Sequence, residues 1–169
     1  MSRIIKNNRV VDDDWRLLKL AEGETPEAVA LPGADAIVPL PVWQARKDEI
    51  LARGQPVGVW LDADEGPEAI AAELARFAVV AVNFPKFTDG RGYSTARLLR
   101  ERYGYAGELR AIGDVLRDQL FFMKRCGFDA YAVRADKDVV AALAGLDGFP
   151  ESYQAAIDQP WPLFRRRSA

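Results

Sequence analysis

The sequence predicts an α/β fold in which a parallel sheet alternates with helices. Short valine-rich runs, such as residues 57–61 and 77–82, recur along the chain, and a stretch with helical spacing of apolar residues follows each one. Strands that alternate with helices imply right-handed crossovers and therefore a parallel sheet. The 169 residues hold about five such units, too few for a complete eight-stranded barrel, which needs roughly 200 residues or more. We expect a single domain, residues 1–169, with a doubly wound sheet. The alternative is a truncated barrel that a second copy completes as a homodimer.

The first 20 residues predict a β-hairpin. Two apolar pairs, residues 4–5 and 10–11, flank Asn7 and Asn8, and asparagine tolerates the positive φ of a tight turn. From there the expected strands span residues 36–40, 57–61, 77–82, 108–112 and 130–133. The helices that follow them are expected at about residues 42–53, 67–76, 93–103, 114–125 and 137–146. Pro41 fits the start of the first helix, where a missing N–H is tolerated.

Residues 159–169 are expected to form a C-terminal tail, because the prolines among them cannot continue a helix. Trp161, Leu163 and Phe164 lie close together in it, and such an apolar patch is unfavourable in water. We expect the tail to dock on the core of its own chain, with a second copy or another protein as the alternatives.

The residue types that are missing narrow the chemistry. There is no histidine and one cysteine, Cys126, which excludes Ser-His-Asp catalysis, a disulfide within the chain and an iron–sulfur site built by this chain alone. The pair Gly90-x-Gly92 lacks the rest of a dinucleotide-binding fingerprint. Any metal would need oxygen ligands, as magnesium does. We therefore expect no cofactor and no metal, and no redox centre of the chain's own.

The balance of charge favours an anionic ligand over nucleic acid. A calculated pI of 5.3 is far from that of a nucleic-acid-binding domain. Residues 83–134 nevertheless hold ten basic and six acidic side chains, a balance of +4, whereas the remainder holds thirteen and nineteen, a balance of −6. This basic region suits a small anion, with solvated arginine-rich helix faces as the alternative. Apolar runs of strand length and a polar N-terminus predict a cytoplasmic protein that does not contact the membrane.

The loop at residues 83–94 is the predicted ligand site. It follows one strand and precedes a helix, so it lies at the carboxyl end of the sheet, where α/β folds bind their ligands. Lys86 and Arg91 are the expected anion ligands, and Ser94 adds a hydroxyl donor. Asp89 would serve as a helix cap, a magnesium ligand or a catalytic base, and capping is the expectation for this residue taken alone.

Three more charged residues fall near the same edge of the predicted sheet. Arg110, on the strand at 108–112, either reaches the ligand loop or lies with Glu108 at a solvated sheet edge. Arg134 ends the next strand and would be a third cation. Asp114 is expected to cap the helix that follows it, with acid–base catalysis as the alternative.

Residues 83–136, which read NFPKFTDGRGYSTARLLRERYGYAGELRAIGDVLRDQLFFMKRCGFDAYAVRAD, resemble a bacterial family catalogued as domain-of-unknown-function family 934. The resemblance extends more loosely to the hairpin at 7–15, the strand at 57–61 and Tyr153-Gln154. Members of this family are commonly labelled oxidoreductases of sulfite reduction, largely because their genes lie beside assimilatory sulfite reductase. The resemblance therefore implies a pathway more firmly than a reaction.

Our first hypothesis is an accessory protein of assimilatory sulfite or sulfate reduction. It would bind a small sulfur oxyanion or a phosphosulfate-type ligand at loop 83–94, through Lys86, Arg91 and Arg110.

Two alternatives come from other classes of protein. One is a non-catalytic scaffold that docks on sulfite reductase through the C-terminal tail or through basic helices bearing Arg97, Arg100 and Lys124. The other is an enzyme that uses Asp89 or Asp114 in acid–base catalysis. Such an enzyme would not carry out redox chemistry by itself, because the chain shows no redox centre to support the family's oxidoreductase label.

Overall fold

Eight strands form one curled sheet in the computed structural model, which describes residues 2–147. The C-terminal tail expected at residues 159–169 lies outside the described residues. The strands stand in the order β2-β1-β8-β7-β6-β5-β4-β3. Their bounds are β1 (Ser2–Lys6), β2 (Arg9–Asp13), β3 (Arg16–Leu17), β4 (Ala36–Pro39), β5 (Val57–Leu61), β6 (Val79–Phe84), β7 (Glu108–Gly113) and β8 (Ala130–Tyr131).

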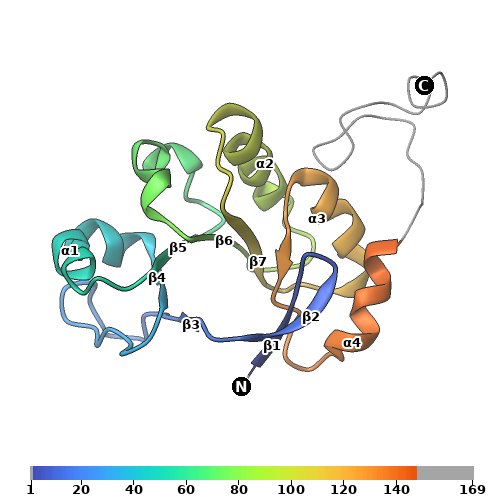
Figure 1. The fold of residues 1–169 in the computed structure, drawn as a ribbon, viewed down its shortest axis with the longest axis horizontal. Coiled ribbons are helices and arrows are strands. Elements are labelled where there is room, and N and C mark those ends of the chain that lie inside the picture. Colours follow the sequence, from blue (N-terminus) through green and yellow to red (C-terminus); the bar gives the residue numbers. More distant parts are fainter. Residues whose placement is uncertain (1, 148–169) are drawn as a thin grey trace.

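The helices lie on the outer side of the curved row of strands (Figure 1). The α-helices are α1 (Leu40–Ala52), α2 (Arg91–Arg97), α3 (Leu120–Cys126) and α4 (Val139–Ala142). A π-helical stretch, Leu98–Arg102, continues α2, and short 3₁₀ helices span Pro67–Ala69, Ala71–Arg76, Arg117–Gln119 and Leu143–Asp147. Within the described part of the chain, no helix is both long and apolar enough to cross a membrane.

The strand order corrects one expectation and confirms its alternative. Strands β3 to β8 are parallel and neighbour one another in chain order, whereas a doubly wound sheet reverses direction at a switch point. The expectation of a doubly wound sheet is therefore wrong, and the truncated-barrel alternative describes the curled half-barrel that is observed. The count of five βα units is not matched either. The crossover from β5 to β6 holds two 3₁₀ helices in place of an α-helix, and β3 adds a short parallel strand.

The N-terminal hairpin is confirmed. Strands β1 and β2 pair in antiparallel fashion, with Ile5 opposite Val10. Asn7 and Asn8 form the turn with φ of 49° and 62°, the left-handed values that a two-residue hairpin turn requires. The hairpin extends the parallel sheet because β1 also pairs with β8, where Ile5 lies opposite Tyr131.

The two faces of the sheet carry separate apolar layers, because side chains alternate along each strand. Val80 and Val82 of β6 belong to the large core under the helices, whereas Val79 and Ala81 belong to a smaller cluster on the inner, concave face. Gly58 of β5 permits this inner packing: a Cβ there would lie 3.0 Å from both the Val79 carbonyl oxygen and Cγ1 of Ile37.

The two edge strands of the sheet, β2 and β3, follow one another directly in the sequence. Strand β2 ends at Asp13 and β3 begins at Arg16, so Asp14 and Trp15 alone connect one edge to the other. Trp15 packs against the inner apolar cluster, as Trp60 also does. We call this junction the seam of the half-barrel.

Candidate functional site

The predicted ligand loop is held in place by the two elements beside it. The loop connects β6 to α2, and its Phe87 N–H donates to the Asp114 carboxylate over 2.7 Å. The Gln119 side-chain amide donates to the Phe87 carbonyl over 2.6 Å. Asp114 follows β7, and Gln119 ends the 3₁₀ helix before α3. One residue of the loop is thus fixed through both its N–H and its C=O.

Asp89 and Arg91 form an ion pair on this loop. Arg91 Nη2 lies 2.7 Å and Nε 3.1 Å from the Asp89 carboxylate, which also accepts from the Arg91 backbone N–H. The helix cap itself is Gly90, so Asp89 makes a turn that leads into α2. Hydrogen bonds from Arg91 lower the pKa of Asp89 to about 2. A carboxylate with so low a pKa is a poor base near neutral pH.

Acidic residues after β5 face the same loop. The hydrogen bond that Arg91 donates to Asp89 raises the pKa of Arg91, and the charges of Asp64 and Asp62 act in the same direction. Asp62 also accepts from the Asn83 side-chain amide over 2.9 Å. Our reading of the sequence missed these two carboxylates, although the rule that placed loop 83–94 also applies to the residues that follow β5.

Arg134 lies at the predicted edge, but carboxylates occupy its guanidinium. Nη1 lies 2.7 Å from Asp114, and Nε and Nη2 lie 2.6 and 3.0 Å from Asp136. These bonds raise the pKa of Arg134, and its hydrogen bond is the main reason that the pKa of Asp114 is lowered. Arg134 therefore braces the end of β8 against the end of β7. Asp114 supports the ligand loop, and the next helical turn begins only at Arg117.

Arg110 does not reach the ligand loop. Its side chain is buried on the inner face, where Nε lies 2.7 Å from Glu108 and Nη1 lies 3.0 Å from Asp13 of β2. Lys6 of β1 completes this inner network, with Nζ 2.6 Å from Glu108. The strand alternation that places Glu108 and Arg110 on one face also directs them into the half-barrel, so their charges are paired with each other and with the hairpin.

Of the predicted anion ligands, Lys86 and Arg91 remain on the loop with access to solvent. Lys86 is exposed, and the Arg91 side chain is 60% exposed. The hydrogen bonds from Arg91 to Asp89 use Nε and Nη2, and Nη1 has no hydrogen-bond partner within residues 2–147. Ser94 is also exposed and lies on α2, one helical turn beyond Arg91.

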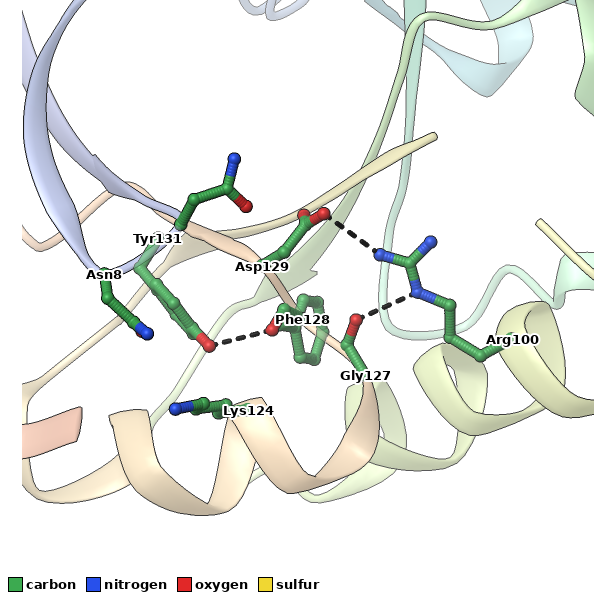
Figure 2. Close-up of a pocket in the computed structure, with 8 residues that line it drawn as sticks. Asn8, Arg100, Lys124, Gly127, Phe128, Asp129 and Tyr131 are labelled. Atoms are coloured by element: carbon green, nitrogen blue, oxygen red, sulfur yellow. Dashed lines mark hydrogen bonds and ion pairs between the residues drawn. The ribbon is translucent and has the colours of Figure 1, made fainter. Parts of the chain in front are cut away.

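A second hollow lies at the other end of the sheet, beside the hairpin turn (Figure 2). Its volume is about 290 Å³, and Arg100 and Lys124 are the basic residues in its wall. Arg100 donates to the Gly127 carbonyl over 2.9 Å and lies 3.3 Å from the Asp129 carboxylate. It also donates to two carbonyls of the turn that follows the π-helical stretch. Arg100 thus joins internal elements, so the basic surface expected from Arg97, Arg100 and Lys124 is smaller than predicted.

Comparison with known proteins identifies one family. A family model described as a bacterial protein of unknown function (DUF934) matches residues 58–164. No curated protein matches the chain.

Proposed function

Because the chain belongs to the bacterial DUF934 family, whose function is unknown, we propose that it is an accessory protein of assimilatory sulfite reduction that binds a small sulfur oxyanion. The pathway comes from the resemblance of residues 83–136 described above. The ligand class comes from the cations of loop 83–94. Lys86 and Arg91 are the proposed ligands, while Arg110 and Arg134 leave the proposed set because carboxylates hold them.

The observation that carries this proposal is that the Arg91 guanidinium is held in one orientation on a fixed loop. Asp89 binds one edge of the guanidinium, and the loop beneath it is fixed at Phe87. The orientation of Arg91 is therefore set before a ligand arrives, which reduces the entropy lost on binding. Lys86 lies on the same loop and adds a second positive charge.

The affinity should be modest and should depend on salt. Both cations are exposed, and exposed ion pairs contribute little because water and salt screen them. A dissociation constant on the order of 0.1–1 mM, about −5.5 to −4 kcal/mol, is what two such contacts support.

Titration calorimetry with sulfite, sulfate, phosphate and adenosine phosphosulfate tests the proposal. We expect one of these anions to bind the native chain and Arg91→Ala to abolish the binding. Arg97→Ala is the matched control, because Arg97 is an exposed arginine of the same helix that pairs with Glu101 over 3.5 Å. Binding retained by Arg91→Ala, with a native circular dichroism spectrum, would count decisively against the proposed site.

A second candidate function is docking on sulfite reductase, and an exposed aromatic surface favours it. Phe87 and Phe122 are 56% and 54% exposed, and Phe122 packs on Tyr93 with ring centroids 4.8 Å apart. Gln119 of the segment leading into α3 bonds to the Phe87 carbonyl, so the two phenylalanines border one region. Exposed aromatic side chains are typical of protein-binding surfaces.

Co-purification with the reductase distinguishes the second function from the first. Phe122→Ser should weaken the complex, whereas Val140→Ser, an exposed apolar residue on α4, should leave it unchanged. If both variants bind the reductase equally well, this surface is not the docking site.

A further inference from the structure

A cleft of about 530 Å³ lies at the seam, where the two edges of the half-barrel come together. One wall comes from β1 and from the residues that follow β8, among them Ile4, Ala132 and Val133. The other wall comes from Trp15, Arg16 and Leu17 of the connection between the edges and of β3. The volume falls within the range of roughly 300–1,000 Å³ that is usual for small-molecule sites.

The apolar part of this cleft is firmly placed. Trp15 packs on the inner cluster formed by Ile37, Val79, Ala81 and Ile112, and its backbone N–H donates to the Asp13 carboxylate over 3.3 Å. Ile4 is buried, while Leu17 is 37% exposed. An aromatic ring with apolar neighbours on the opposite wall forms a slot for a flat, apolar group.

The charged side chains that line the cleft are mostly positive. Arg3, Arg16 and Lys137 line it, and within residues 2–147 Asp13 is the one acidic lining residue. Asp13 is buried and paired with Arg110 over 3.0 Å, so its charge is already neutralised. Lys137 has a distant pair with Asp136, at 3.9 Å.

The two arginines are open to a ligand. Within residues 2–147, neither Arg3 nor Arg16 forms an ion pair or a side-chain hydrogen bond, and both are exposed. Guanidinium groups bind phosphate and sulfate-type groups through paired hydrogen bonds. The slot thus suits a flat ring, the arginines suit an anionic group, and one molecule can carry both.

We propose that the seam cleft binds an organic anion made of a flat ring and a phosphate- or sulfate-type group. The ring packs against Trp15, and the anionic group binds Arg3 and Arg16, with Lys137 nearby. This site is separate from loop 83–94, so it stands or fails independently of the proposed function.

Titration calorimetry with adenosine monophosphate and with 1-anilinonaphthalene-8-sulfonate tests the proposal, because both probes combine a ring system with the required anion. We expect at least one probe to bind the full chain with a dissociation constant below about 1 mM. Inorganic phosphate, which lacks the ring, should bind at least tenfold more weakly. The Arg3→Gln/Arg16→Gln double variant should lose at least tenfold in affinity for the probe.

Matched variants separate the cleft from general effects. Arg9→Gln removes an exposed arginine of β2 that does not line the cleft, and it should keep the native affinity. The comparison of phosphate with the probe is made in the Arg91→Ala background, where phosphate cannot bind at loop 83–94. Trp15→Phe should weaken binding of the probe more than it weakens binding of phosphate. If Trp15→Phe fails to fold, the Arg3→Gln/Arg16→Gln double variant decides the outcome. The proposal is wrong if neither probe binds, if the double variant binds as the native chain does, or if phosphate matches the ring-bearing probe.

Discussion

Replacing Arg110 with methionine should destabilise the half-barrel more than any surface substitution. Arg110 is 3% exposed, and it contacts two carboxylates that are themselves 8% exposed, Glu108 and Asp13. Methionine fills much of the same space but cannot donate hydrogen bonds. Glu108 keeps its ion pair with Lys6 at 2.6 Å, whereas among residues 2–147 Asp13 keeps only the long hydrogen bond from the Trp15 N–H. Within that part of the chain, the variant therefore leaves a buried carboxylate without a cation.

Removing one partner of a buried ion pair lowers the free energy of unfolding by roughly 3–5 kcal/mol. Single domains have about 5–15 kcal/mol in total, so the variant should remain folded at room temperature but with a small margin. For a chain of this size each kcal/mol corresponds to about 2–4 °C, so the melting temperature should fall by roughly 6–20 °C.

Urea unfolding followed by circular dichroism measures the change in the free energy of unfolding. Arg97→Met is the control, and this exposed arginine should change stability by about 0.5 kcal/mol or less. A triple variant, Arg110→Met with Asp13→Asn and Glu108→Gln, should recover part of the loss because it buries no unpaired carboxylate at those positions. A loss below about 1 kcal/mol for Arg110→Met alone would refute the reasoning, since the inner carboxylates would then need no cation.

Three further predictions concern other parts of the molecule. Gly58→Ala should lower the free energy of unfolding by about 1–3 kcal/mol, because the new Cβ would press on the backbone of β6. Gly33→Ala is the control, because the space around Gly33 is open. Equal stability of the two variants in urea would contradict the prediction. Asp114→Ala should speed hydrogen exchange of the loop amide that it accepts from at least several-fold, and an unchanged rate would show that this bond does not hold the loop. The Arg91 guanidinium lowers the pKa of Asp89 from 3.8 to about 2. The contribution of this pair to stability is therefore complete above about pH 4 and is lost as the pH falls through about 2. NMR titration of the carboxyl carbon should show the pKa returning toward 3.8 in Arg91→Ala, and a pKa that stays near 2 would assign the shift to another group.

Local pattern was enough to locate the five main parallel strands and the loop between β6 and α2. The runs at 57–61 and 77–82 are apolar throughout because helices and the inner cluster cover both faces, and this produces a strong signal. The turn at Asn7 and Asn8 was readable because few residues tolerate positive φ.

Sequence pattern could not predict the order of the strands in the sheet, because it does not show on which side each new strand is added. Each crossover in a half-barrel resembles a crossover in a doubly wound sheet, and the two differ only in the side on which the next strand is added. The same limit applies to Arg110, whose alternation with Glu108 was readable but whose partner Asp13 lies on a strand far away in sequence. Asp114 was expected as a helix cap because short-range rules favour that role, yet its partners come from the loop after β6 and from the end of β8.

The pairing of β1 with β8 also has a consequence for how the protein is made. The hairpin is synthesised before its neighbour in the sheet, β8 at Tyr131, which is the last in chain order of the eight strands within residues 2–147. Until then the exposed edge of β1 has no partner, and such edges are prone to pair with other chains. Strand β1 is therefore made before β8 but reaches its place in the sheet only after β8 has been made. Slowing translation should prolong this vulnerable interval and increase aggregation of the nascent chain.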